Sequence, residues 1–229
     1  MPQPHELTVS EAAREIKSKK LSPVELAESL LERIEATDDA LKAWITIDRE
    51  KVLTNAKQRE EEAGRGDIRG ALHGVPVGLK DIFYTAGMKT AAGSKVYADF
   101  VPEFDATCVV KIKEAGGIIL GKAVTTEFAT SDPSPTYNPW NFEHTPGGSS
   151  SGSSVAVATK TVGAALGSQT GGSTCRPAAY NGIVGLKATY GRISRYGVVP
   201  VSWSLDHVGI LVRTVEDACL LYTSPSPRD

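Results

Sequence analysis

Residues 146–177 read PGGSSSGSSVAVATKTVGAALGSQTGGSTCRP, which places two glycine- and serine-rich turns on either side of an apolar segment. Glycine allows the backbone positive φ angles and a close approach to a ligand, so each turn can direct peptide N–H groups and a serine hydroxyl at one point. Brought together, the two turns predict a nucleophile beside an anion hole. The rest of the chain is interpreted as the scaffold that brings them together.

Each turn alone has an ordinary interpretation. A glycine-serine run such as 147–154 is most often a flexible linker. This run continues directly into residues 155–158, Val-Ala-Val-Ala, and an apolar segment of that kind favours burial. The sequence Gly-Gly-Ser at 171–173 is likewise a common turn, whose serine would merely cap the segment that follows. The prediction therefore rests on the pair of turns and their spacing.

A serine hydroxyl becomes a good nucleophile only when a base takes its proton. The chain has four histidines, His5, His73, His144 and His207, and none has a clear tie to a serine. His207 follows Asp206, so a Ser/His/Asp arrangement stays open, although adjacent residues on an extended chain point to opposite sides.

Lys80 is the better candidate for the base. It lies in residues 74–83, GVPVGLKDIF, a run whose β-branched and apolar residues predict a buried strand that enters a loop. Burial disfavours the ammonium form and lowers the pKa of a lysine, which allows it to accept a proton near neutral pH. The alternative is that Lys80 pairs with Asp81 or extends to the surface.

Three segments together resemble the amidase signature family of Ser-Ser-Lys amide hydrolases. They are GVPVGLKDIF with Lys80, PGGSSSGSS with Ser149 and GSQTGGSTCRPA with Ser173, in that order along the chain. Residues 191–197 and 204–209 are similar to later core segments of the family, and the resemblance covers roughly residues 6–218. It implies an α/β fold in which helices flank a mixed central sheet.

The resemblance also implies a mechanism. Ser173 would attack an amide carbonyl and form an acyl-enzyme, Ser149 would relay the proton through a hydroxyl that follows a cis peptide bond, and neutral Lys80 would be the first base. The oxyanion would bind to the backbone N–H groups of Thr170, Gly171, Gly172 and Ser173, each such donor being worth about 2.7–4 kcal/mol in other acyl-transfer enzymes. No metal and no cofactor are expected.

The chain departs from the family pattern beside Ser173. Gln169 stands where the family usually has an acidic residue, and Thr174 and Cys175 stand where it has an aliphatic residue and an arginine; Arg176 comes one position late. None of the three relay residues is changed. Cys175 is expected to be a buried structural cysteine, because no base dedicated to it can be identified.

The composition is that of an ordinary globular protein. The 229 residues are 41 % hydrophobic and carry a formal net charge of −2, which gives no reason to expect binding to nucleic acid or to an anionic membrane. The three cysteines form neither a metal-binding spacing nor a paired framework, and there is no signal peptide or spanning apolar run. We therefore expect a cytoplasmic protein.

The remaining elements alternate between helix and strand. Residues 8–62 are expected to be helical, with capping boxes at Thr8 and Ser22, apart from a short strand at 44–47. Asp105 is expected to cap a helix that ends at Gly116, and residues 117–120 to form a buried strand. The spacing from Gly116 to Lys122 imitates a phosphate-binding loop, but Ala123 replaces the required Ser or Thr and the glycines precede the strand.

The C-terminus is expected to depart from the native protein. Thr214 opens a helix, yet SPSPRD follows after about two turns, and family members run to about twice this length. Residues 1–218 are therefore interpreted as the N-terminal part of an amidase domain that is truncated at its C-terminus. Residues 219–229, CLLYTSPSPRD, are interpreted as a non-native tail that resembles a translated sequencing adaptor.

Three functions follow from the resemblance. The first is a stand-alone amidase that hydrolyses a small carboxamide, as a monomer or as a homodimer, and residues 198–204 favour it. The second is the glutaminase (A) subunit of a glutamyl-tRNA(Gln) or aspartyl-tRNA(Asn) amidotransferase, with B and C subunits as partners. The third is a catalytically silent binding protein or fragment with the same fold, against which the intact set of Lys80, Ser149 and Ser173 argues.

Overall fold

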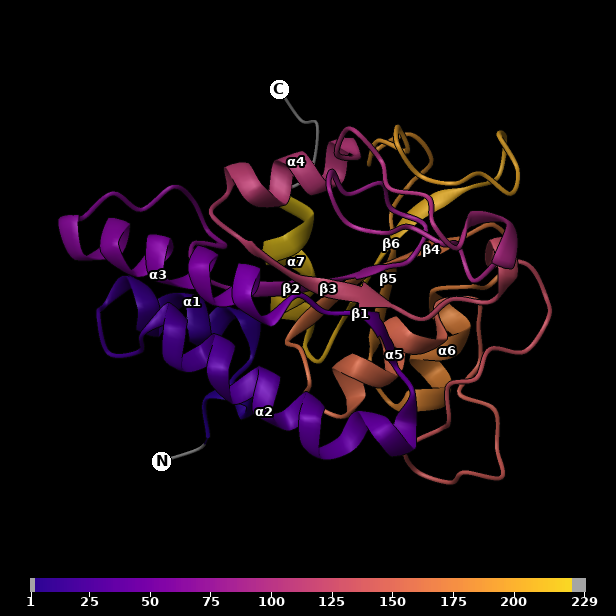
Figure 1. Ribbon diagram of the computed structural model, residues 1–229, viewed down its shortest axis with the longest axis horizontal. Coiled ribbons are helices and arrows are strands. Elements are labelled where there is room, and N and C mark those ends of the chain that lie inside the picture. Colours follow the sequence, from indigo (N-terminus) through magenta and orange to yellow (C-terminus); the bar gives the residue numbers. More distant parts are fainter. Residues whose placement is uncertain (1–2, 224–229) are drawn as a thin grey trace.

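The fold is built on a six-stranded mixed sheet, as the alternation of helix and strand patterns predicts. The structure is a computed structural model that describes residues 3–223. The sheet has the order β1-β3-β2-β4-β6-β5 (Figure 1). The strands are β1 (Trp44–Thr46), β2 (Pro76–Lys80), β3 (Ile118–Ala123), β4 (Ala164–Gln169), β5 (Val184–Lys187) and β6 (His207–Val212).

The middle of the sheet is parallel and its margins are antiparallel. β2 runs parallel to both β3 and β4. β1 is antiparallel to β3, and β6 is antiparallel to both β4 and β5. All residues of β2, β3 and β4 are buried, which is the pattern of strands covered on both faces.

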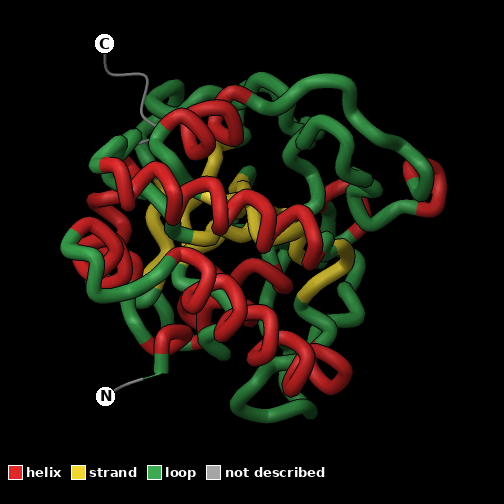
Figure 2. The backbone as a smooth tube through the Cα atoms, turned by 60° about the vertical axis from the view of Figure 1, so that its left-hand side comes forward, coloured by secondary structure: helices red, strands yellow, loops and turns green. Residues whose placement is uncertain are grey.

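Helices cover both faces of this sheet. α2, α5 and α6 lie on one side of it and α4 on the other, and the sheet passes between helices in the rotated view (Figures 1 and 2). The helices are α1 (Val9–Lys17), α2 (Pro23–Leu41), α3 (Arg49–Arg65), α4 (Thr107–Glu114), α5 (Ser151–Ala158), α6 (Cys175–Asn181) and α7 (Val215–Thr223). Three short 3₁₀ turns complete the described elements, at Pro4–Glu6, Lys95–Tyr97 and Glu127–Ala129.

Both capping boxes expected near the N-terminus are formed. Thr8 exchanges hydrogen bonds with Glu11 at the start of α1, and Ser22 does so with Glu25 at the start of α2, where Pro23 is the first helical residue. The apolar stripe of α2 is buried against the core, as its 3.6-residue period predicts. Its members are Leu26, Ala27, Leu30, Leu31 and Ile34.

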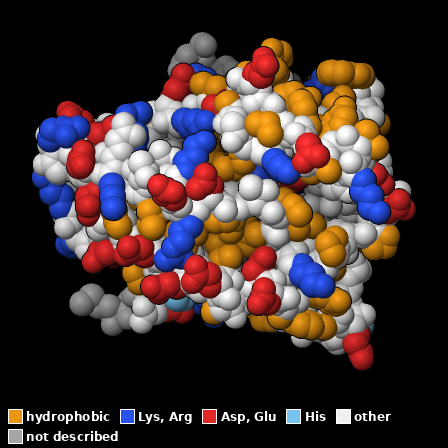
Figure 3. All heavy atoms as spheres, in the orientation of Figure 1, with side chains coloured by type: hydrophobic (Ala, Val, Ile, Leu, Met, Phe, Trp, Pro, Cys, Tyr) orange, Lys and Arg blue, Asp and Glu red, His pale blue; other side chains and the backbone are white. Residues whose placement is uncertain are grey.

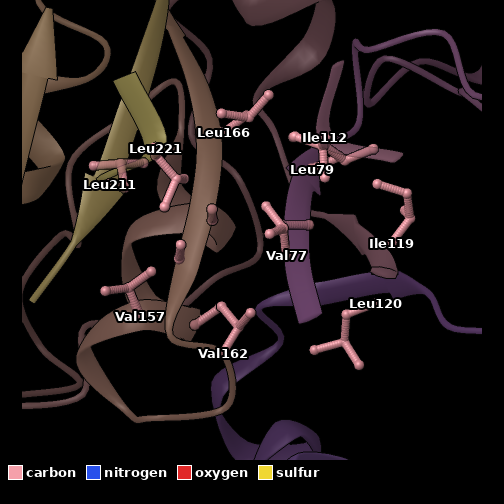
Figure 4. Close-up of a cluster of buried hydrophobic side chains, with 14 of the residues drawn as sticks. Val77, Leu79, Ile112, Ile119, Leu120, Val157, Val162, Leu166, Leu211 and Leu221 are labelled. Carbon is pink, nitrogen blue, oxygen red and sulfur yellow. The ribbon is translucent and has the colours of Figure 1, made fainter. Parts of the chain in front are cut away.

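One continuous hydrophobic core joins the sheet to its helices. Val77 and Leu79 of β2 lie between Leu166 of β4 and Ile119 of β3, with Leu221 of α7 near the β6 side (Figure 4). All five side chains are buried. Truncating such a leucine to alanine costs about 2–5 kcal/mol, so this packing fixes the strand ends that carry the polar site.

In the region of α4 and β3, the structure contradicts the cap predicted at Asp105 and agrees that residues 116–122 do not form a phosphate-binding loop. The prediction that Asp105 caps α4 is wrong: the helix follows Ala106 without a side-chain cap, because the Asp105 carboxylate accepts the Ala86 N–H and pairs with Lys113. Lys122 lies inside β3 and is buried against Asp81 at 3.1 Å, so the segment from Gly116 has no phosphate-loop geometry.

At the C-terminal end, α7 extends through Thr223, and Leu221 within it is fully buried. The rest of the expected tail, residues 224–229, lies outside the described residues. Among the described helices, none is long and apolar enough to span a membrane. Nor does the described part of the chain hold a cluster of three or more His, Cys, Asp or Glu side chains placed to bind a metal ion.

Candidate active site

Lys80 is the last residue of β2, and its side chain is completely buried. Its Nζ donates to Ser149 Oγ at 2.6 Å and to Ser168 Oγ at 2.8 Å. The sequence interpretation named Lys80 and Ser149 but missed Ser168, which ends up beside Lys80 because β4 is the parallel neighbour of β2. Lys80 therefore lies between two hydroxyls and does not pair with Asp81.

Burial changes the proton affinity of this lysine. Desolvation of the ammonium form lowers the pKa of Lys80 from 10.5 to about 7, and the charge of Asp206 only partly opposes that shift. Lys80 is therefore able to be neutral, and to accept a proton, near neutral pH. This is the property that the apolar sequence around Lys80 predicts.

Ser149 lies in the first glycine-serine turn, immediately before α5. The Gly148–Ser149 peptide bond is cis, as the family resemblance implies, and Gly147 has a φ of 74° that favours glycine. Every serine from Ser149 to Ser154 is buried. Ser150 accepts the Ser168 N–H, and Ser153 donates to the carbonyl of Leu166. The run is therefore buried and hydrogen-bonded to β4 at Ser150 and Ser153, which excludes a flexible linker.

Ser173 lies in the second turn, between β4 and α6, and its side chain is largely buried. The two turns touch through their backbones, because the Ser150 N–H donates to the carbonyl of Ser173 at 3.3 Å. Within the described residues, the Ser173 hydroxyl makes no hydrogen bond to Ser149 or Lys80. The structure thus joins Lys80 to Ser149 by a hydrogen bond and joins the turn that holds Ser173 to the turn that holds Ser149 through the backbone.

The four predicted oxyanion donors lie at the end of β4. Between residues 3 and 223, no hydrogen bond uses the backbone N–H of Thr170, Gly171, Gly172 or Ser173 as its donor. Space is open above Gly171, since a Cβ built there would meet nothing within 4 Å. These N–H groups therefore have no acceptor among the described residues.

Gln169 organises the turn that holds Ser173. Its Oε1 accepts the backbone N–H groups of Thr174 at 3.0 Å and Cys175 at 2.9 Å. These donors belong to the first turn of α6, whose N–H groups have no partner within the helix. The neutral amide of Gln169 thus caps the start of α6, at a position where the family resemblance leads us to expect an acidic residue.

Arg176 connects the two turns. Its Nε and Nη2 both donate to the carbonyl oxygen of Gly148, at 3.1 and 2.6 Å. That carbonyl directly precedes Ser149, and Arg176 is the second residue of α6, three residues after Ser173. The arginine that the sequence places one position late therefore contacts the backbone of the first turn.

Asp206 holds a neighbouring loop against the oxyanion turn. Its Oδ1 accepts the Thr170 hydroxyl at 2.5 Å, and its Oδ2 accepts the N–H groups of Val201 and Ser202. The adjacent His207 bonds instead to the carbonyl of Leu205 at 2.7 Å. The alternative Ser/His/Asp arrangement is therefore not formed. Asp206 instead holds the loop at 201–202 against Thr170, and no short sequence motif indicates this contact.

Two further side chains differ from simple expectation. Cys175 is exposed, so the prediction of a buried cysteine there is wrong: α6 turns this position outward, with Sγ 4.0 Å from the carbonyl of Gly185. The buried cysteine is Cys108, whose pKa is raised to about 12 by desolvation. The second such side chain is that of Lys122, which is fully buried and pairs with Asp81, the residue that follows Lys80.

The comparisons with known proteins agree with this geometry. The family described as Amidase matches residues 25–229. The chain is 47 % identical over 221 residues to the A subunit of the glutamyl-tRNA(Gln) amidotransferase from Carboxydothermus hydrogenoformans, covering 94 % of this chain and 46 % of the relative. The corresponding protein from Geobacter sp. strain M21 is 46 % identical, with the same two coverages.

Solved structures give the same result. A native peptide amidase from Stenotrophomonas maltophilia superposes with a TM-score of 0.94 at 39 % identity, over 100 % of this chain and 50 % of that one. The A subunit of the glutamyl-tRNA(Gln) amidotransferase from Thermotoga maritima gives a TM-score of 0.81 at 37 % identity, over 99 % and 48 %. The chain spans about half the length of the curated relatives it matches. By sequence and by fold, the chain belongs to the amidase family.

Proposed function

We propose that this chain carries the reaction centre of an amidase that hydrolyses a carboxamide C–N bond through an acyl-enzyme. The observation that carries the proposal is Lys80: a buried lysine with a pKa of about 7, donating hydrogen bonds to Ser149 and Ser168. A buried lysine with no acidic partner is costly to maintain for structure alone, whereas a base needs this environment.

The proposed mechanism assigns one step to each residue. Ser173 Oγ attacks the carbonyl carbon while its proton passes through the Ser149 hydroxyl to neutral Lys80. The N–H groups of residues 170–173 bind the resulting oxyanion. The C–N bond then breaks, and the proton returns from Lys80 through Ser149 to the departing nitrogen. Water attacks the ester by the same route and releases the acid.

The second candidate is the glutaminase component of a tRNA-dependent amidotransferase. The observation that favours it is the 46–47 % identity to relatives with that name, against 39 % for the peptide amidase. In that case the substrate is glutamine, the product ammonia is passed to a partner, and B and C subunits are required. A stand-alone enzyme would act on a small carboxamide as a monomer or homodimer, and either candidate would work in the cytoplasm.

Trapping of the acyl-enzyme tests the reaction itself. Incubated with amide substrates and hydroxylamine, the chain should transfer the acyl group to give a hydroxamate, and Ser173→Ala should abolish this transfer. Glutaminase activity that appears only after addition of B and C subunits would select the second candidate. A folded chain that forms no acyl-enzyme with any amide, alone or with those subunits, would instead support the silent alternative.

A further inference from the structure

A pocket of about 280 Å³ lies against the start of β3 and is walled by α3, α4 and the loop at residues 85–88. We call it the α3 pocket. Both helices contact β3, so packed secondary structure forms much of the wall. None of the residues assigned to the proposed reaction centre lines this pocket. It is therefore a separate place on the described part of the chain.

Positive charge predominates in the lining. Four cationic side chains and one acidic side chain line the pocket, namely Lys51, Arg59, Arg69, Lys113 and Asp48. The acid is already engaged, because Asp48 accepts the backbone N–H of Lys51 at 3.0 Å where it caps α3. A concave surface lined mainly by charges of one sign concentrates ions of the opposite sign. The α3 pocket therefore attracts anions.

Arg59 is the most buried cation of the lining. Its side chain is only 9 % exposed, and it shares the carboxylate of Glu62 with Arg69, at 3.0 Å from Arg59 Nη1 and 2.9 Å from Arg69 Nε. A guanidinium has five N–H donors, and no other described group bonds to the Arg59 side chain. Its unused nitrogens are not among the buried atoms that lack a partner, so they are reached from the pocket. Burial lowers the pKa of Arg59, and the charge of Glu62 offsets only part of this shift.

The other cations leave positive charge in excess. Lys113 pairs with Asp105 at 2.5 Å, whereas Lys51 forms no ion pair with any described residue. With Asp48 and Glu62, three carboxylates thus stand against four cations in the lining and its ion-pair partners. One positive charge is left for a ligand.

Buried apolar side chains complete the lining, namely Val52, Met88, Ile118 and Ile119. They can cover a small apolar body, and the volume is at the low end for ligand pockets, so the ligand is compact. A phosphate ester presents three peripheral oxygens to cations that come from α3, from α4 and from the segment after α3, whereas a carboxylate presents two. The lining therefore fits a phosphate group attached to a compact apolar body.

We propose that the α3 pocket binds a compact phosphate monoester, with the phosphate among the cations and the apolar body against Val52 and Ile118. The site does not depend on the proposed amidase function, because it shares no residue with the reaction centre. It gives the chain a second small-molecule site, for a different chemical class of ligand.

Calorimetric titration of the unchanged chain tests the proposal with phenyl phosphate as the probe. We expect saturable one-to-one binding that is about tenfold tighter than that of inorganic phosphate, which lacks the apolar body, and about tenfold tighter than that of phenylacetate, which carries a carboxylate instead. The affinity should fall as salt is added. Absence of saturable binding, or an affinity for either comparison probe that equals or exceeds that for phenyl phosphate, would overturn the proposal.

Substitutions on α3 and at its cap assign the binding to this pocket. Lys51→Gln removes a cation that has no ion pair among the described residues, so it should weaken phenyl phosphate binding about threefold with unchanged circular dichroism. Lys57→Gln is the matched control, because Lys57 is an exposed lysine of the same helix that does not line the pocket. Asp48→Asn should strengthen binding, since it removes the acid of the lining and keeps a side chain that caps the helix. Equal affinities in Lys51→Gln and Lys57→Gln would contradict the site.

Discussion

At the scale of single residues, the site depends on how far Lys80 is removed from water. Its side chain is wholly buried and has hydroxyls, not carboxylates, as hydrogen-bond partners. With no ion pair to stabilise the ammonium, desolvation dominates and brings the pKa of Lys80 to about 7. The burial that allows Lys80 to act as a base also lowers the stability of the folded chain. The effect on the pH profile and the effect on the free energy of unfolding can be measured separately.

The pH profile of hydrolysis should follow the proton on Lys80. Because the base must be neutral, kcat/KM is expected to rise with pH through about 7 and then to level off. Ser168→Ala removes an acceptor that favours the ammonium form, so it should move this rise to lower pH, whereas Ser168→Thr should leave it in place. A rise that stays at the same pH in Ser168→Ala would show that Ser168 does not tune the base.

Stability should depend on Lys80 in the same pH range. The unfolded chain holds the lysine proton up to about pH 10.5 and the folded chain only up to about pH 7, so stability rises with pH between these values. Lys80→Met removes the penalty and should be more stable than the unchanged chain by on the order of a few kcal/mol at pH 6. Urea unfolding at pH 6 and pH 10 checks this, since the gain must shrink at pH 10.

At the scale of elements, the ends of three neighbouring strands are held in place by buried polar contacts. β2 ends at Lys80, β4 ends at Gln169, and β3 supplies Lys122. Lys122 pairs with Asp81, and desolvation lowers the pKa of Lys122 and raises that of Asp81. Lys122 also donates to the carbonyl of Phe83 at 2.9 Å, so β3 fixes the loop that follows Lys80.

Breaking this pair should be costly. Asp81→Leu leaves the buried Lys122 charge without its partner and should lower the free energy of unfolding by about 3–5 kcal/mol. The double variant Asp81→Leu with Lys122→Met should recover much of that loss, because neither buried charge remains. Denaturant unfolding of the single and double variants checks this, and a double variant as unstable as the single one would contradict it.

The cap on α6 gives a second prediction at this scale. Gln169→Leu leaves the N–H groups of Thr174 and Cys175 without an acceptor, and should destabilise the chain by about 1–3 kcal/mol and lower the rate of acylation. Gln169→Glu keeps an acceptor at the same place and serves as the matched control. Equal stability of the two variants would show that the Gln169 contacts contribute nothing.

At the scale of the whole molecule, the two ends of one face carry different side chains. In the view of Figure 3, charged side chains crowd the region over α1, α2 and α3, and hydrophobic side chains gather toward the opposite end. Exposed large side chains recur in the loops between β5 and β6, among them Tyr196, Trp203 and Leu205. The edge strand β5 is only partly covered.

These features predict self-association. A partly covered edge strand beside exposed aromatic side chains favours contacts between chains. Sedimentation velocity should therefore show a sedimentation coefficient that increases with concentration, and Trp203→Gln should reduce the increase. A monomer at all concentrations that melts cooperatively would contradict this prediction.

The extent to which the fold and site follow from sequence can be traced to particular residues. The apolar sequence around Lys80 predicts a buried base, and the glycine-serine turns predict a nucleophile beside an anion hole. The choice of Ser149 and Ser173 within those turns comes from the resemblance to the amidase family. Local patterns do not predict the roles of Ser168, Asp206 or the Asp81–Lys122 pair. Strand register and loop packing bring these residues to the site, and neither can be read from a short stretch of sequence. The predictions that Asp105 caps α4 and that Cys175 is buried are wrong. Both depend on the direction in which a side chain points, which local sequence does not determine.

Covalent labelling is the measurement that tests the central claim most directly. The account predicts that a fluorophosphonate modifies Ser173 in the unchanged chain, as mass spectrometry of its peptides would show, and that Lys80→Ala and Ser149→Ala suppress the reaction in folded protein. Labelling of Ser173 at the same rate in Lys80→Ala would contradict the role of Lys80 as base. Modification of another residue in its place, with Ser173 unreacted, would contradict the site itself.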